Sequence, residues 1–195
     1  MLASLTGLGL SAAAGLNAYI PLLVVGLLAR YTDVIVLPAA FGWMESGAVL
    51  AVVAALLLAE IVLDKVAVVD HVNDLVQTFV RPAVGGAIFA ATSAAEQVDA
   101  SSWMQEHQWV GWLLGIVTAG VIHATKATIR PAVNVSTVGV GTPVVSVAED
   151  ATSLGMSLIA IFIPILVLLL LVLLAWGAYR LRRRTRRRGR RAQPA

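Results

Sequence analysis

Cysteine is absent from this chain of 195 residues, and histidine occurs only three times. The protein therefore has no disulfide framework, no thiolate metal site and no cysteine nucleophile. No H-E-x-x-H motif is present either, and we expect neither a metal nor another cofactor. Charged residues make up only 13% of the chain, whereas 59% of its residues are hydrophobic. This composition is typical of an integral membrane protein.

The few basic residues are distributed unevenly. Nine of the fourteen Lys and Arg residues lie in 180–195, so the chain up to Tyr179 holds five basic and eleven acidic residues, a net charge of −6. An arginine run directly after a spanning helix favours a cytoplasmic anchor on anionic lipid, at about 1 kcal/mol per basic residue. We expect one membrane domain over 1–179 and a disordered cytoplasmic tail over 180–195, for which nucleic acid is an unfavoured partner.

Apolar runs divide the chain into about six membrane segments. A helix needs about 20 residues to cross the hydrocarbon core. The sequence predicts an all-α polytopic helical bundle with four full spans and two segments that are short or broken by Gly and Pro. The spans are Leu5–Ala29, Gly47–Leu63, Trp109–Ala124 and Ala151–Tyr179, and the short segments are Pro82–Ala95 and Pro131–Ala148.

Residues Val68–Val80 show apolar positions at helical spacing. This pattern predicts an amphipathic helix in the membrane interface, with its apolar face against the bilayer or the bundle. We expect its polar residues at the cytoplasmic surface, among them Asp70, His71, Asn73 and Asp74.

The charges between the segments indicate an orientation, because Lys and Arg favour the cytoplasmic side. With six segments and both termini inside, Lys65, Arg81, Lys126 and Arg130 lie inside, and only Arg30 disagrees. A four-span alternative, in which the two short segments are re-entrant, stays open. In the six-segment arrangement these acidic residues lie outside: Asp33, Glu45, Glu96, Asp99, Glu106, Glu149 and Asp150.

The motif Arg-Pro-Ala-Val occurs twice, at Arg81–Val84 and Arg130–Val133. Each copy follows a Lys-containing apolar segment and precedes a short Gly-rich one, which defines an internal repeat over about 47–95 and 109–148. Internal repeats in membrane proteins are typical of transport pathways. Lipid cannot satisfy the backbone of short or broken segments, so these must be buried in protein or line water.

Several motifs in combination resemble an uncharacterised family, the bacterial membrane proteins grouped as domain of unknown function family 4126. The resemblance extends from about Gly15 to Pro164 and implies a multi-pass protein of the bacterial cytoplasmic membrane, without supplying an activity. The motifs are Gly15–Pro21, Glu60–Lys65, Asp70–Asp74, Arg-Pro-Ala-Val-Gly-Gly from Arg81, and Gly141-Thr142-Pro143 with Ser146, Glu149 and Asp150.

Two acidic residues stand on one helical face late in the second span. Glu60 and Asp64 are four residues apart, and Lys65 follows directly. Charges at membrane depth cost about 2.5–3.5 kcal/mol each on insertion scales and usually mark a pathway or a paired site. We expect Glu60 to be a proton or cation site, while Asp64 and Lys65 form either part of the pathway or an interfacial pair.

The second copy of the repeat places His123 and Lys126 where the first has Glu60 and Lys65. Histidine titrates near physiological pH. We therefore expect Glu60 and His123 to face each other across a cavity and to share a proton or an ion. A hydrogen-bonded histidine between helices is the alternative for His123.

Both arginines of the repeat precede prolines that suit the first position of a helix. Free backbone N–H groups at a helix start attract anions, so Arg81 and Arg130 are candidates for an anion site. The alternative is anchoring at the inner membrane surface together with helix initiation. Glu149 and Asp150 are expected to cap the N-terminus of the last span, with an external cation-recruiting site as the alternative.

Polar residues in apolar segments either line the route or hold helices together by hydrogen bonds. These are Asn17, Asn134, Ser136, Thr137 and Thr142.

The sequence favours a small transporter or channel-like permease, coupled to protons or cations through Glu60 and the site formed by His123 and Lys126. One alternative is a membrane enzyme acting on a phosphorylated lipid at the cytoplasmic face, through Arg81, Arg130 and the Asp70–Asp74 cluster. Another is a scaffold that recruits partners through its Arg tail. The solute and a homo-oligomeric state stay open.

Overall fold

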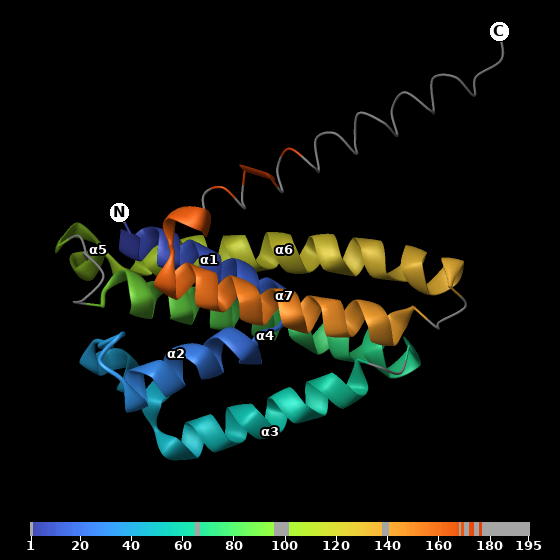
Figure 1. The fold of residues 1–195 in the computed structure, drawn as a ribbon, viewed down its shortest axis with the longest axis horizontal. Helices are drawn as coiled ribbons and strands as arrows, with labels where there is room; N and C mark the ends of the chain where they lie inside the picture. Colours follow the sequence, from blue (N-terminus) through green and yellow to red (C-terminus); the bar gives the residue numbers. More distant parts are fainter. Residues whose placement is uncertain are drawn as a thin grey trace, which may run out of the picture.

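The fold is described by a computed structural model at residues 2–64, 67–95, 102–137, 141–167, 169, 172, 173 and 176. These residues form helices and connecting turns, with no strand in the described ranges, so the all-α prediction is confirmed (Figure 1). The helices are α1 (Leu2–Leu16), α2 (Tyr19–Tyr31), the 3-10 helix η1 (Ala39–Glu45), α3 (Gly47–Leu63), α4 (Ala67–Ser93), α5 (Ser102–Glu106), α6 (Gln108–Ser136) and α7 (Thr142–Phe162).

Three helical stretches are long and apolar enough to cross a membrane, namely Asn73–Ser93, Gln108–Pro131 and Thr142–Phe162. The pair η1 and α3 is bent by 55° and makes a fourth if it is one broken span. The six-segment count predicted from the sequence is finer than this result and stays a prediction.

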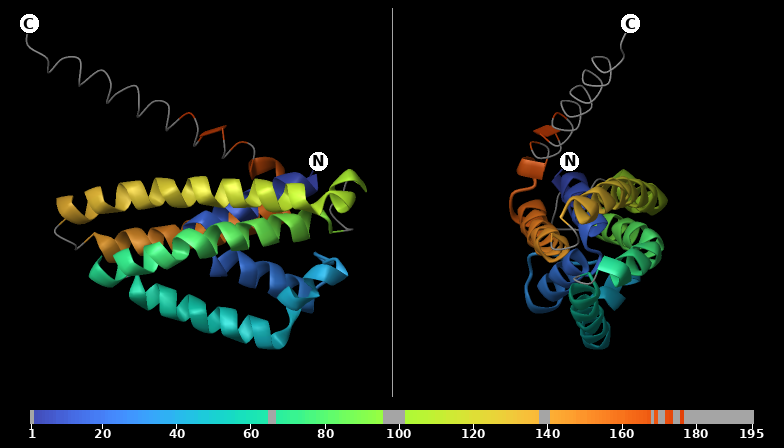
Figure 2. Two further views of the ribbon diagram at one scale, coloured as in Figure 1. Left: turned by 180° about the vertical axis from the view of Figure 1, so that it is seen from behind. Right: turned by 90° about the vertical axis from the view of Figure 1, so that its right-hand side faces the viewer.

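Helix α1 lies in the middle of the bundle. It packs against α4, α6 and α7, and the end-on view shows it between them, with α3 at the edge (Figure 2). Leu10, Ala12, Ala13 and Ala14 are completely buried. Small side chains on α1 allow this close packing. Helix α1 ends at a point about midway along the long helices (Figure 1).

The predicted first span, Leu5–Ala29, is not one helix. Asn17 ends α1 by donating its backbone N–H to the carbonyl of Ala13 at 3.0 Å. Its side-chain Oδ1 accepts from the backbone N–H groups of Tyr19 and Ile20 at 3.0 and 3.2 Å, as an N-cap residue does. Helices α1 and α2 therefore form a hairpin with its tip inside the bundle.

Because of the hairpin, the start of α1 lies at a different end of the bundle from the one predicted from the sequence. Near the start of α1, Gly7 lies against Phe89, late in α4, while Gly26 of α2 lies against Met44 of η1. The chain leaves α2 at the end of the bundle where α1 began (Figure 1). Because two short helices replace one span, the N-terminus and Asp33 lie at the same end, contrary to the arrangement predicted from charges.

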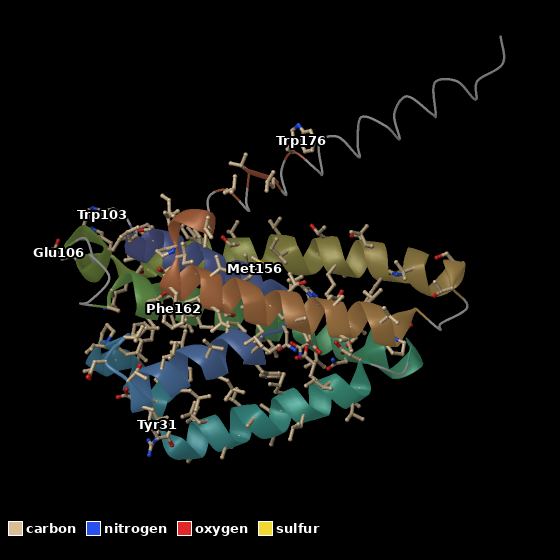
Figure 3. All side chains as sticks on the ribbon, in the orientation of Figure 1. Tyr31, Trp103, Glu106, Met156, Phe162 and Trp176 are labelled. Carbon is tan, nitrogen blue, oxygen red and sulfur yellow. The ribbon has the colours of Figure 1, made fainter. Side chains whose placement is uncertain are left out.

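That same end carries exposed aromatic and acidic side chains. Figure 3 shows Tyr31, Trp103 and Glu106 toward this end, and Trp103 is 52% exposed. Trp and Tyr are enriched at membrane–water interfaces. This end of the bundle therefore has the character of a membrane boundary, whereas the C-terminal ends of α3 and α6 lie at the opposite end (Figure 1).

Helix α4 joins two elements that the sequence separated. The predicted interfacial helix Val68–Val80 and the short segment Pro82–Ala95 are one helix with Pro82 in its interior, and α6 likewise contains Pro131. The predicted segment Pro131–Ala148 is instead divided between the end of α6 and the start of α7. Prolines inside such helices are tolerated where neighbouring groups satisfy the freed backbone.

The amphipathic helix α4 turns its apolar face outward and its polar face into the bundle. Leu75 and Phe79 are 61% and 79% exposed, whereas Gln77 and Arg81 are 1% and 0% exposed. An apolar face turned outward suits lipid and not water. The polar face is thereby placed inside the bundle, where it forms the site described below.

Helices α4 and α6 approach each other through glycines. A Cβ on Gly115 would overlap with the carbonyl oxygen of Gly85 and would lie 2.7 Å from the Cα of Gly86. A Cβ on Gly155 of α7, by contrast, would meet no heavy atom within 4 Å. Glycine at 115 is thus required by the distance between the two helices.

We expect Gly115→Ala to destabilise the protein by about 1–3 kcal/mol, because the backbones of α4 and α6 must move apart. Gly155→Ala should be neutral or stabilising, since alanine favours a helix by about 1 kcal/mol over glycine. Thermal unfolding in detergent micelles measures both variants. Equal stability of the two would show that the α4–α6 contact is looser than described.

Candidate functional site

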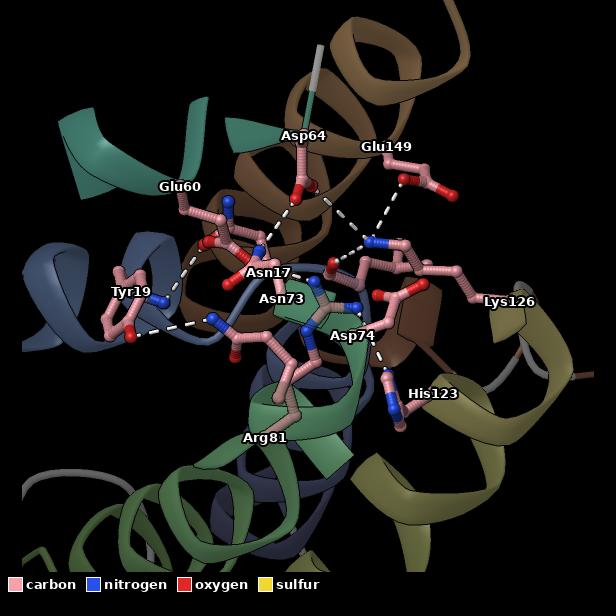
Figure 4. A network of polar contacts seen from close by, with 12 residues as sticks. Asn17, Tyr19, Glu60, Asp64, Asn73, Asp74, Arg81, His123, Lys126 and Glu149 are labelled. Atoms are coloured by element: carbon pink, nitrogen blue, oxygen red, sulfur yellow. Dashed lines mark hydrogen bonds and ion pairs between the residues drawn. The ribbon is translucent and has the colours of Figure 1, made fainter. Parts of the chain in front are cut away.

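Buried and half-buried charged side chains gather around the point where α1 ends (Figure 4). Carboxylates come from the C-terminal end of α3, from α4 and, twice, from α7, whereas the cations come from α4 and α6. The ionised members are Glu60, Asp64, Asp74, Arg81, Lys126, Arg130, Glu149 and Asp150, and the imidazole of His123 lies beside them.

The first part of the site is a chain of three residues centred on Arg81. One guanidinium nitrogen, NH2, lies 2.8 Å from Oε1 of Glu60, and the other, NH1, lies 3.2 Å from Nδ1 of His123. Glu60, Arg81 and His123 are 2%, 0% and 4% exposed. Glu60 and His123 are thus joined by the side chain of Arg81, which corrects the prediction that they face each other across a cavity.

The contacts of His123 assign its tautomer. Arginine only donates hydrogen bonds, so Nδ1 of His123 must accept from Arg81. Nε2 then carries the proton and donates to Oγ1 of Thr78 at 3.1 Å, while the Thr78 hydroxyl donates to the carbonyl of Asp74 at 2.8 Å. His123 is therefore neutral in this arrangement.

The second part of the site joins α3, α6 and α7. Oε2 of Glu149 lies 3.1 Å from both Nζ of Lys126 and NH2 of Arg130. Oδ2 of Asp64 lies 3.8 Å from Lys126 and 3.5 Å from Arg130. Asp74 is 3.9 Å from NH1 of Arg130. Two cations and three carboxylates thus form one ion-pair network.

The end of α1 is bound by side chains from these helices. Lys126 donates to the carbonyl of Leu16 at 3.2 Å, and Arg81 is 3.5 Å from the carbonyl of Gly15. Ser153 of α7 donates to the carbonyl of Ala13 at 3.0 Å. Carbonyls at a helix C-terminus lack partners within the helix and carry partial negative charge, so cations stabilise them.

The anion site predicted at Arg81 and Arg130 is wrong in its premise. Neither arginine stands at a helix start, because α4 and α6 continue through the following prolines. Both guanidinium groups are buried and face carboxylates instead. Each proline does lie next to an arginine of the site, but it stands in the interior of its helix and not at the start.

The predicted cap of the last span is also wrong. Helix α7 begins at Thr142, so Glu149 and Asp150 lie in its interior. Glu149 contacts the cations of α6, whereas Oδ1 of Asp150 accepts from Nδ2 of Asn17 at 2.9 Å. Adjacent positions on a helix point about 100° apart, which sends the two carboxylates to different neighbours.

The other predicted residues fall into three groups. Asn73 joins the site by donating to Oδ1 of Asp64 at 2.8 Å. Thr137 instead accepts from the backbone N–H of Gly141 at 3.0 Å and so stabilises the turn before α7, and Ser136 donates to the carbonyl of Val133. Thr142 is buried. Lys65, the tail 180–195 and the side chains of Asp70, His71 and Asn134 lie outside the described part of the chain.

Gln77 and Tyr19 belong to the site although they were not singled out from the sequence. Nε2 of Gln77 lies 3.5 Å from the hydroxyl of Tyr19, so the two side chains connect α4 with the start of α2. Gln77 precedes Arg81 by one helical turn, and this spacing was the available signal.

The described site has more acid than base. Its five carboxylates face three permanent cations, since His123 is neutral. Removing charges from water is costly unless they are compensated, so the excess favours an additional proton or cation. Within the described ranges, no group of three or more His, Asp or Glu residues is arranged to hold a metal ion.

Comparison with known proteins gives one match. A family model described as "Domain of unknown function (DUF4126)" matches residues 4–184 and confirms the resemblance seen in the sequence. No curated protein and no solved structure matches the chain.

Proposed function

This chain belongs to the DUF4126 family, and we propose that it is a small membrane transporter. The family description names no activity, so the proposal is drawn from the charged site. Protons or cations would pass the chain formed by Glu60, Arg81 and His123. The observation that carries the proposal is the position of this ion-pair chain beside the broken helix formed by α1 and α2. Multi-pass insertion in a bacterial cytoplasmic membrane is part of the proposal.

The depth of the site supports transport. Arg81 is eight residues from the start of the candidate span Asn73–Ser93, and His123 is eight residues from the end of Gln108–Pro131. At 1.5 Å per residue, both lie about 12 Å inside their spans. Ionisable groups at such depth are rare and usually belong to ion or substrate pathways.

The break at Asn17 gives independent support. Many secondary transporters bind ions where a helix is interrupted near the middle of the membrane, because the interruption frees backbone carbonyls. Here the carbonyls of Gly15 and Leu16 face Arg81 and Lys126. A proton or cation that changes the pairing of these two side chains would also change how the α1–α2 tip is held.

The proposed coupling follows from the donors and acceptors of Arg81. A proton on Nδ1 of His123 removes the acceptor for NH1 and places two cations side by side. A proton on Glu60 removes the counter-charge of NH2, and its Oε2 is buried without a hydrogen-bond partner in the described residues. Either proton therefore weakens the attachment of Arg81 and favours a second arrangement of α1 and α4.

The orientation that we propose keeps the C-terminal ends of α3 and α6 on the cytoplasmic side, because Lys65 follows α3 and both Lys126 and Arg130 lie toward the end of α6. The end with exposed Trp and Tyr then faces outward, together with the start of α1. The positive-inside rule supports this choice. The enzyme alternative has less support, because Arg81 and Arg130 are buried and bound to carboxylates, which leaves little of either guanidinium for a phosphorylated lipid.

Proton flux into proteoliposomes tests the proposal. A potassium gradient with valinomycin imposes a membrane potential, and a trapped pH-sensitive dye reports proton entry. We expect Glu60→Gln and His123→Gln each to lower flux at least tenfold, with the double variant little slower than either, because both act on Arg81.

Glu106→Gln and His107→Gln are matched controls, since they make the same substitutions at the aromatic end of the bundle and should keep wild-type flux. Wild-type flux in both site variants would exclude this pathway. Absence of flux of protons, Na⁺ and K⁺ in the wild-type protein would favour the scaffold alternative.

A further inference from the structure

A second feature of the molecule lies on the other side of α7 from the ion-pair network. A cleft of about 480 Å³ opens between α2, α3 and α7. Its walls are aliphatic and include Leu23 of α2, Leu57 of α3, and Ala151 and Leu154 of α7. Asp150 is the one polar residue among the described residues that line it.

Asp150 differs from the other carboxylates of the site. Glu60, Asp64, Asp74 and Glu149 each lie within 4 Å of a Lys or Arg side chain. Asp150 has no such ion pair within the described residues, and its polar contact there is the amide of Asn17 at 2.9 Å. Its neighbour Glu149 faces the cations of α6, so those cations do not neutralise Asp150.

The depth of Asp150 makes this charge significant. It stands eight residues from the start of the candidate span Thr142–Phe162, about 12 Å along the helix. Asp150 therefore lies about as deep as Arg81 and His123. A carboxylate at this depth with aliphatic walls around it is poorly solvated, so a counter-ion that also fills the apolar space would stabilise it.

We propose that the cleft binds a lipophilic organic monocation, with its charged centre at Asp150 and its apolar groups between α2, α3 and α7. The volume lies in the range of small-molecule pockets, about 300–1,000 Å³. A hard metal cation would need several oxygen ligands, and the walls supply only one carboxylate. An anion would be repelled by Asp150, and a neutral lipid would leave the carboxylate uncompensated.

This inference names a substrate class for the proposed transporter, and its transport part rests on that proposed function. Binding itself does not. Asn17 connects the two, because the same side chain donates to Asp150 and caps α2. A cation that draws Asp150 away from Asn17 would loosen the α1–α2 tip next to Arg81 and Lys126.

Binding of radiolabelled tetraphenylphosphonium to the purified full chain in a nonionic detergent tests the site by equilibrium dialysis. Tetraphenylborate has the same shape and the opposite charge, so it serves as the control probe. We expect saturable binding of the cation, no saturable binding of the anion, and at least tenfold weaker cation binding in Asp150→Asn. Asp33→Asn makes the same change on an exposed loop and should bind like the wild type.

Ala151→Trp provides a second variant, because it fills the cleft without altering a charge, and it should also abolish binding. Circular dichroism and gel filtration establish which variants fold, and the two variants are read independently. Wild-type affinity in a folded Asp150→Asn or Ala151→Trp variant, equal binding of the two probes, or no binding by the wild type would overturn the inference.

Flux separates the two proposals. Cation binding that depends on Asp150, in a protein without flux, would retain the binding site and reject the transporter. Proton flux that depends on Glu60 and His123, in a protein that does not bind tetraphenylphosphonium, would retain the transporter and reject this substrate class.

Discussion

Replacing Arg81 with Met should lower the free energy of unfolding by about 3–5 kcal/mol, because the buried Glu60 carboxylate then loses its counter-charge. His123 loses the donor to its Nδ1 in the same variant, and the carbonyl of Gly15 loses a contact. Reversible unfolding in mixed detergent micelles measures the change. Arg30→Met, which removes an exposed arginine bonded to the carbonyl of Glu45, should cost below about 1 kcal/mol.

The double variant Arg81→Met with Glu60→Met distinguishes a lost ion pair from lost packing. Replacing both partners of a buried pair by apolar groups is often neutral or stabilising, so the double variant should recover most of the lost stability. If the two substitutions add instead, Arg81 stabilises the fold mainly through its contacts with α1 and not through Glu60.

Arg130→Met should have a second large effect of about the same 3–5 kcal/mol. It leaves Asp64 and Glu149 with Lys126 as their remaining cation among the described residues, and it removes the Arg130 partner of Asp74. The same unfolding measurement applies. Adding Glu149→Gln removes one of the uncompensated carboxylates and should restore part of the stability, whereas Glu106→Gln, an exposed acid at the other end of the bundle, should restore none.

A loss below about 1 kcal/mol for Arg130→Met would mean that water reaches the network between α6 and α7 and screens its charges. The neighbouring groove between these helices, with a volume of about 280 Å³ and Lys126, Arg130 and Glu149 among its lining residues, is the route by which water would enter.

Local pattern in the sequence was sufficient to find most members of the site. Glu60 and Asp64, four residues apart, do project to one side of α3, and both meet cations there. His123, Lys126 and Arg130 were found because charges are rare in apolar helices. The all-helical fold followed from the same apolar runs.

The local sequence pattern could not predict which side chains pair with each other in the site. Arg81 binds Glu60 and His123, which are 21 and 42 residues away, and Arg130 binds Asp64 at a separation of 66. Such pairs depend on how α3, α4 and α6 pack against one another. A proline at 82 or 131 is compatible with both a helix start and a helix interior, so the two arginines were assigned to helix starts, whereas both lie in helix interiors.

The break between α1 and α2 at Asn17 could not be predicted from the sequence for a related reason. Leu5–Ala29 has the length and composition of a continuous span, and Asn17 alone signals the cap of α2. An asparagine within an apolar run indicates equally a polar contact between helices. Its contact with Asp150, 133 residues away, depends on where α7 lies.

The end of α1 has a consequence for biosynthesis. Its last carbonyls receive donors from Arg81, Lys126 and Ser153, so α1 is completed by helices that are synthesised later, of which α7 is the last. At 5–20 residues per second, Ser153 is made on the order of ten seconds after Leu16. During that interval the end of α1 has to be satisfied by water, lipid head groups or the insertion machinery. Conditions that delay α7 should therefore expose the N-terminal hairpin to quality-control proteases first.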